Sequence, residues 1–233
     1  MPTRFYFPAE GSGAPTIPNN PGFDAGWEQT GQATRLNLLR KSRLSTPSTI
    51  ADNGSRTVPI TTTQDVLCNQ FISEPLPAGF RFDTSMTFSL VIRAFENATT
   101  NNVTLAVVVK VISQDGLTVR GTLFSTFNTD TEFAVSASAA TRIVNAQALT
   151  ALTTQPGDRL VVEIGGHAAA PTAAGSYTMR QGNSAASDFA LTSGLTTDLN
   201  PWCEFSAVLW DSDLNNYRSV RADTGISVAE RVR

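Results

Sequence analysis

Apolar and polar residues alternate along two long stretches in the middle of the chain, residues 86–94 and residues 103–112. Successive side chains of a strand point to opposite faces of a sheet. This period of two therefore predicts two long β-strands, joined by the polar residues 96–102. The apolar positions that share one face are Met86, Phe88, Leu90, Ile92 and Ala94 in the first stretch and Val103, Leu105, Val107, Val109 and Val111 in the second.

Turn signals divide the neighbouring sequence into further strands. The Asp115-Gly116 dipeptide tolerates positive φ and predicts a turn, and Pro156-Gly157-Asp158 predicts another before residues 159–164 alternate again. This spacing predicts about eight to ten strands and almost no amphipathic helix. The fold class is therefore expected to be all-β, an antiparallel β-sandwich. The long strands near residues 80–95 and 102–113 favour a jelly-roll-like arrangement of two sheets.

Three regions differ in composition. Residues 1–56 begin with a stretch rich in Pro, Gly and Asn and predict an extended N-terminal arm with loops, although the leucines of residues 36–44 allow one short helix or an edge strand. Residues 57–210 hold the alternating pattern and predict the sandwich domain. Residues 211–233 are polar, carry four arginines and predict a C-terminal extension outside the sandwich.

Composition and charge narrow the class of protein. The chain of 233 residues is 41% hydrophobic, enough for a packed core, and its 30 Thr and 20 Ser favour strands over helices. A net charge of −3, without a basic run interleaved with aromatics, predicts no nucleic-acid partner. Residues 1–13 lack the pattern of a signal peptide, and no apolar run approaches the roughly 18 residues of a membrane span, so no membrane partner is expected.

Candidate catalytic and metal-binding residues are few. The single histidine, His167, follows Gly165-Gly166 at the end of a predicted strand, with Asp158 and Glu163 upstream and no GxSxG motif. We interpret it as incidental, and we expect Glu163 to be exposed on its strand. The carboxylates that a glycosidase could pair are Glu96, Glu163 and Glu204. We favour the interpretation that these carboxylates lie on solvent-exposed faces of their strands. Neither enzymatic activity nor a catalytic residue is therefore predicted.

Metal and cofactor motifs are also missing from the sequence. The two cysteines, Cys68 and Cys203, lie in apolar runs without a CxxC partner and predict buried free thiols rather than a zinc site. Residues 211–216 imitate the start of a calcium loop, but Asn216 stands where an EF-hand has Gly. A looser calcium site at Asp211 and Asp213 stays open, and no cofactor is predicted.

Aromatic residues leave one alternative of another class open. Exposed Trp and Tyr side chains stack on sugar rings in carbohydrate-binding modules, whereas buried ones would fill the sandwich. Burial of at least one tryptophan in the last predicted strand is favoured. The aromatic candidates for a glycan partner are Trp27, Trp202, Trp210, Tyr177 and Tyr217.

Four blocks of sequence, taken together in their order and spacing, resemble a known family. They are SRTVPITTTQDVLCNQFISEPLPAGF (Ser55–Phe80), GLTVRGTLFST (Gly116–Thr126), QPGDRLVVEIGG (Gln155–Gly166) and LTSGLTTDLNPWCEFS (Leu191–Ser206). Together they resemble a β-sandwich family of virion structural proteins found in tailed bacteriophages. The resemblance covers residues 1–210, since RFYF and GWEQT near the start also fit, whereas residues 211–233 lie outside its pattern.

The resemblance implies a non-enzymatic virion protein that is made in the host cytoplasm. A capsid decoration or cement protein that binds major capsid subunits is the first expectation, as a homo-oligomer with a trimer as first choice. The alternatives are a tail or head–tail connector component and a carbohydrate-binding or receptor-binding module. The expected partner contacts are Phe5, Tyr6, Phe7 and Trp27 in the N-terminal arm and Arg218, Arg221, Arg231 and Arg233 in the C-terminal extension.

Overall fold

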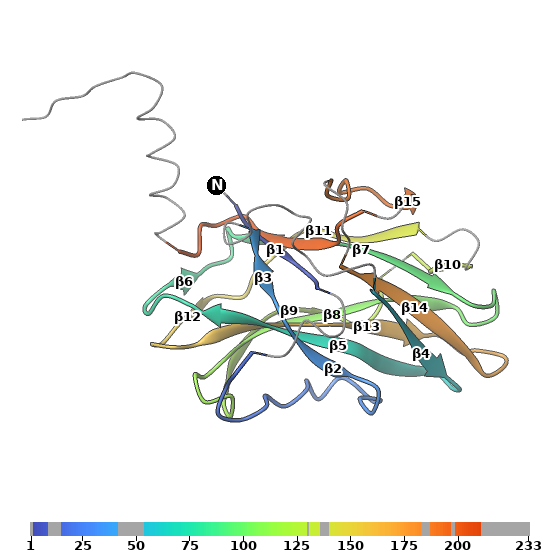
Figure 1. The fold of residues 1–233 in the computed structure, drawn as a ribbon, viewed down its shortest axis with the longest axis horizontal. Coiled ribbons are helices and arrows are strands. Elements are labelled where there is room, and N and C mark those ends of the chain that lie inside the picture. The colour runs from blue at the N-terminus through green and yellow to red at the C-terminus, as the bar shows by residue number, and fades with distance from the viewer. Residues whose placement is uncertain are drawn as a thin grey trace, which may run out of the picture.

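The computed structural model describes residues 2–8, 15–41, 54–129, 131–135, 140–182, 187–196 and 199–210. This part of the chain is built from strands, contains no α-helix, and forms the two layers of a β-sandwich (Figure 1), so the predicted fold class is confirmed. No helix within these residues has both the length and the apolar character that crossing a membrane requires.

Eight strands form the framework of the sandwich, and eight shorter ones are added to it. The framework strands are β4 (Gly54–Ile60), β5 (Gln64–Pro75), β7 (Thr87–Glu96), β8 (Val103–Ile112), β9 (Val119–Thr126), β11 (Ala140–Ala148), β13 (Arg159–Ala168) and β14 (Gly175–Gln181). The additions are β1 (Thr3–Tyr6), β2 (Thr34–Asn37), β3 (Leu39–Arg40), β6 (Arg81–Phe82), β10 (Ala134–Val135), β12 (Leu152–Thr153), β15 (Gly194–Leu195) and β16 (Trp202–Phe205).

The framework has the connectivity of a jelly roll. One layer has the strand order β4-β14-β7-β11 and the other has the order β5-β13-β8-β9, with every neighbouring pair antiparallel. The chain crosses between the layers at most steps, so strands that follow each other in sequence seldom pair. This is the eight-stranded, two-sheet arrangement of jelly-roll domains. Two of the short strands are parallel exceptions, β2 beside β5 and β10 beside β7.

Turns occur where the sequence predicts them. Gly116 and Gly157 both have a φ of 81°, in the left-handed region that residues with a Cβ rarely adopt. The first turn joins β8 to β9 and the second leads into β13. The strands that were expected from alternation, β7 and β8, also lie within one or two residues of their predicted bounds.

The N-terminal region is integrated into both sheets instead of extending away from them. β14 pairs with the C-terminal half of β7 and β16 pairs with its N-terminal half. β1 lies next to β16, and β3 lies next to β1, so the start of the chain widens this sheet to nine strands. The prediction of an extended arm is therefore wrong for β1, β2 and β3, whereas residues 15–33 form loops as predicted, and Leu36 and Leu39 lie in edge strands rather than in a helix.

The main core lies between the two sheets. It contains the alternating side chains predicted for β7 and β8, with Phe88 and Val107 among the fully buried ones. Cys68 and Cys203 are buried free thiols in the same core, as predicted. Aromatic rings connect the layers, since the ring centroid of Phe88 on β7 lies 5.9 Å from that of Phe124 on β9 in the other sheet.

Both outer faces of the sandwich are also covered. On the nine-stranded sheet, Phe189 and Trp202 form a second buried cluster with Tyr6 and Val91. On the five-stranded sheet, Trp27 packs on the outer residues of β5 and β8. The segment around Trp27 therefore lies over this sheet, which explains why β8 is apolar on both of its faces.

A buried ion pair fixes that segment to the sheet. Lys110 Nζ on β8 lies 2.7 Å from Glu163 Oε1 on β13, and both side chains are essentially inaccessible to solvent, at 1% and 0% exposure. Lys110 also donates to the carbonyl oxygen of Gly22 at 2.9 Å. Trp27 Nε1 donates to Glu163 Oε2 at 2.7 Å, and so does the backbone N–H of Asp24 at 3.1 Å. The expectation that Glu163 is exposed is wrong, because the covering segment excludes solvent from it.

Gln70 and Arg35 complete this network. Gln70 Nε2 donates to Glu163 Oε1 at 2.9 Å, and Gln70 Oε1 accepts from Arg35 Nε at 3.0 Å. Arg35 also donates to the carbonyl oxygen of Pro21 at 3.0 Å. Each charged group thus has several partners, which offsets the cost of removing charges from water.

The variant Glu163→Gln is expected to lower the free energy of unfolding by about 3–5 kcal/mol, because it leaves Lys110 buried without a counter-charge. Urea unfolding of the two proteins measures the difference. The double variant Lys110→Met/Glu163→Gln is expected to recover most of the loss, since no unpaired charge remains. A double variant as unstable as the single one would contradict this account.

Candidate functional site

The aromatic residues predicted as partner contacts lie inside the protein. Phe5, Tyr6 and Phe7 are fully buried and Trp27 is 6% exposed. The reason is the position of β1 between β16 and β3, which turns Phe5 into the main core and Tyr6 toward the outer cluster. Their predicted role as contacts on another subunit is therefore corrected to a role in this chain's own packing. The other predicted contacts lie outside the described residues: Arg218, Arg221, Arg231 and Arg233.

The aromatic candidates for glycan stacking are placed similarly. Tyr177 and Trp202 are buried, and their polar atoms donate to carbonyl oxygens at 2.7 Å. Trp210 is partly buried, and its Nε1 donates to the carbonyl oxygen of Pro75 at 3.0 Å. Tyr217, Asp211 and Asp213 lie outside the described residues. Trp27, Trp202 and Tyr177 therefore offer no exposed stacking platform.

His167 has a carboxylate partner that its sequence neighbours do not supply. Its Nδ1 lies 2.8 Å from Asp65 Oδ1, with the two side chains 22% and 19% exposed. Asp65 precedes it by 102 positions and faces it across β5 and β13, while Thr104 faces it from β8. The upstream Asp158 instead pairs with Arg120 at 3.2 Å. The position of Asp65 depends on strand pairing, for which the sequence near His167 carries no signal.

The carboxylates considered for glycosidase chemistry do not face one cleft. Glu163 lies on the outer face of the five-stranded sheet, in the ion-pair network. Glu204 alternates with core residues on β16 and pairs with Arg4 at 2.9 Å on the outer face of the other sheet. The hydrophobic core lies between these two faces. Among the described residues, no group of three or more His, Cys, Asp or Glu side chains is placed to hold a metal ion.

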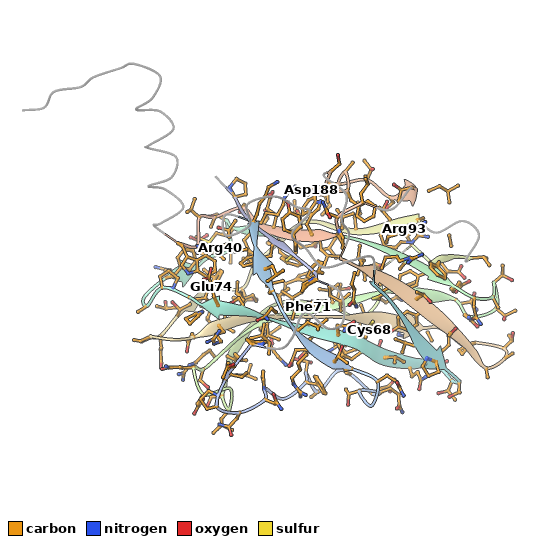
Figure 2. All side chains as sticks on the ribbon, in the orientation of Figure 1. Arg40, Cys68, Phe71, Glu74, Arg93 and Asp188 are labelled. Carbon is orange, nitrogen blue, oxygen red and sulfur yellow. The ribbon has the colours of Figure 1, made fainter. Side chains whose placement is uncertain are left out.

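Asp188 anchors a third cluster of charges on the nine-stranded sheet. Asp188, which Figure 2 labels, accepts hydrogen bonds from Tyr6 at 2.9 Å, Arg4 at 2.7 Å and Lys41 at 3.1 Å. Burial opposes ionisation, but these bonds together hold the pKa of Asp188 below its usual value. The Arg4 guanidinium also lies 3.8 Å from the Trp202 ring centroid, so the cluster ties β1 to β16 and to the 187–200 segment.

Glu96 ends the row of core-facing side chains on β7. It is 1% exposed and accepts a hydrogen bond from the backbone N–H of Val103 at 3.1 Å. Burial raises its pKa to about 7; the bond from Val103 opposes this shift, and the neighbouring carboxylate of Glu132 adds to it. Arg142, only 7% exposed, lies close enough to favour the charged form of Glu96.

The described residues line a hollow on each of two opposite edges of the sandwich. One, of about 400 Å³, lies beside Arg40 on β3 and Glu74 on β5, whose Nε and Oε1 atoms are 2.6 Å apart (Figure 2). Arg40 also stacks 4.2 Å from the Trp210 ring centroid. The residues lining this hollow are Pro15, Thr16, Asn37, Leu38, Leu39, Arg40, Glu74 and Arg159.

The second hollow is a groove of about 510 Å³ between β9 and β11. β9 pairs with β8, and its Leu123 carbonyl oxygen also accepts from the N–H of Thr150 at 2.8 Å, while β11 pairs with β15 only at Ala140 and Thr141. Within the described part of the chain, residues 124–126 of β9 and 142–145 of β11 therefore pair with no further strand along the groove. The groove is lined by Phe124, Ser125, Thr126, Asn128, Thr129, Thr131, Arg142, Ile143, Val144, Asn145, Gln147 and Ser193.

The strand order and the two-layer arrangement make this chain a jelly-roll β-sandwich protein. No protein-family model and no curated protein sequence matches it. Among solved structures it is similar to the VP2 subviral particle of infectious bursal disease virus, with 13% identity and a TM-score of 0.27 over 72% of this chain and 49% of that chain. The structures of the Gx and Gt strains of that virus give 13% and 15% identity and TM-scores of 0.26 and 0.25.

For the Gx strain the match covers 73% of this chain and 48% of that one, and for the Gt strain 72% and 47%. The chain thus spans about half the length of these viral chains. At such low identities and TM-scores, the likeness carries no argument about function.

The stability of the protein is expected to fall as pH rises from about 4.5 to about 7. The folded-state pKa of Glu96 lies above its ordinary value of 4.5, so the folded state binds the proton more tightly than the unfolded state does. One such group changes the free energy of unfolding by at most about 1.4 kcal/mol per pH unit. Thermal melts of the wild type and Glu96→Gln across this range measure it. Glu96→Gln should lose this pH dependence, and an unchanged dependence would refute the assignment.

The variant His167→Ala is expected to change the free energy of unfolding by less than about 1 kcal/mol, because its pair with Asp65 is partly exposed. Chemical unfolding and incorporation into assembled particles are the measurements. A large loss in either would show that the pair has a role beyond the surface contact seen here.

Proposed function

We propose that this protein is a non-enzymatic structural protein of a virion. The observation that carries the proposal is the jelly-roll framework, with strand orders β4-β14-β7-β11 and β5-β13-β8-β9. Jelly rolls form the domains of viral capsids, among other proteins. The resemblance of the four sequence blocks to tailed-phage virion proteins supports the same class.

The charged residues support a structural role. Glu163 fastens the segment of Trp27 to one sheet, Asp188 ties β1 to the 187–200 segment, and Glu74 pairs with Arg40 on β3. These charged groups fasten segments outside the framework strands onto the framework of the same chain. A sandwich covered in this way is a rigid block whose shape is retained when it is packed among other subunits.

In its finer form, the proposal is a capsid decoration or cement protein of a tailed phage. It would bind major capsid subunits as a homo-oligomer, with a trimer as the first expectation. Residues 211–233, with Arg218, Arg221, Arg231 and Arg233, would supply contacts, because the planar guanidinium pairs with carboxylates and stacks on aromatics at interfaces.

Cryo-electron microscopy of particles that carry this protein tests the proposal. Density for the sandwich should repeat at capsid symmetry positions and disappear from particles assembled without the chain. Density on the tail axis alone would move the protein to a tail or connector role, and absence from purified particles would overturn the virion proposal. Mass photometry of the isolated protein should give the mass of three 24.9 kDa chains.

A further inference from the structure

The lining of the groove between β9 and β11 has a specific chemical character. Eight of its twelve residues carry uncharged hydroxyl or amide side chains, and one residue, Arg142, is charged. Hydroxyls and amides both donate and accept hydrogen bonds. The uncharged polar residues are Ser125, Thr126, Asn128, Thr129, Thr131, Asn145, Gln147 and Ser193.

A β-bulge in β11 exposes two of these side chains. The register against β7 shifts between Val144 and Gln147, and Ala146 has a φ of 46°. Asn145 and Gln147 are exposed on either side of Ala146. Bulges of this kind redirect side chains and end regular pairing.

The same bulge disfavours an added protein strand as the occupant. A strand that joins an edge needs a continuous row of free N–H and C=O groups, with pockets for alternate side chains. Here the register against β7 shifts between Val144 and Gln147, and the carbonyl oxygen of Asn145 within this bulge already accepts a hydrogen bond from Gln147 Nε2 at 2.9 Å. The aliphatic lining consists of Ile143 and Val144.

Arg142 contributes little free charge to the groove. Its Nη1 donates to the carbonyl oxygen of Thr141 at 2.8 Å. Its Nε and Nη2 both donate to the carbonyl oxygen of Glu132, the Nε bond being 2.8 Å long. The carboxylates of Glu96 and Glu132 lie near it. An uncharged ligand with many hydroxyls suits this setting better than an anion does.

We propose that this groove is a binding site for a neutral oligosaccharide. Asn145 and Gln147 on one edge and Ser125 and Asn128 on the other would bind sugar hydroxyls, and Phe124 would supply aromatic carbon surface to the sugar ring. The volume of about 510 Å³ lies within the roughly 300–1,000 Å³ typical of ligand pockets. This inference goes beyond the virion role and does not rest on it.

The test uses the full chain on an array of neutral bacterial surface oligosaccharides, followed by titration of the best array ligand into ¹⁵N-labelled protein. Binding should perturb the amide resonances of Ser125, Asn128, Asn145 and Gln147. The double variant Asn145→Ala/Gln147→Ala should bind about tenfold more weakly or worse, because two hydrogen bonds are lost. Both residues are exposed, so the fold should be retained, which the thermal melt of the variant checks.

The matched control is Asn20→Ala/Gln155→Ala, which removes two exposed amides outside the groove. It should bind like the wild type. Absence of binding to any neutral glycan on the array would overturn the proposal. So would binding that the groove variant and the control weaken equally, or resonance changes confined to residues elsewhere. None of these results would affect whether the protein is found in particles.

Discussion

The pair between Lys110 and Glu163 is the interaction on which the arrangement of this protein depends. It lies on the outer face of the five-stranded sheet, a face that a sandwich ordinarily leaves to solvent. Burying two charges there is costly unless other groups satisfy them, and Trp27, Gln70 and the backbone around Gly22 do so. The covering segment and the ion pair therefore require each other. Without the segment the pair would be an ordinary exposed contact, and without the pair the segment would lose the polar partners that hold it in place.

This coupling explains which parts of the fold could be predicted from the sequence. The core-facing alternation of residues 86–94 and 103–111 is a local pattern, and the turns at Gly116 and Gly157 follow from local backbone chemistry. The position of β1 is not local, because Phe5 pairs with Cys203 across nearly the whole chain. An aromatic run in a Pro-rich setting therefore predicts an exposed arm, because its pairing with β16 leaves no local signal. A signal for the covered face did exist, since Lys110 follows Ala106 and Val108 on a face too apolar for solvent.

The candidate sites were less predictable, because each combines residues from strands that are distant in sequence. Asp65 meets His167 through pairing of β5 with β13, and the groove brings together β9, at the edge of one sheet, and the part of β11 that extends beyond its short pairing with β15 in the other sheet. Asn145 and Gln147 are exposed by a bulge, which breaks the very periodicity that identifies strands. Residue type alone leaves the tryptophans open as glycan contacts, although burial is favoured for at least one because an aromatic side chain gains free energy from it, and the structure places Trp27 and Trp202 inside.

Segments pack on both outer faces, and the hollows of the protein lie at the rim of the sandwich. At one edge, the rim is extended by β2 and β3, so the beginning of the chain closes it. At the opposite edge, residues 124–126 of β9 and 142–145 of β11 pair with no further strand within the described residues, and such an edge invites unwanted strand pairing. The bulge at Ala146 prevents regular pairing there, and it exposes amides in the same step. One local irregularity thus has two effects: it interrupts the regular row of backbone groups at this edge, and it places the side chains of Asn145 and Gln147 at the surface of the groove.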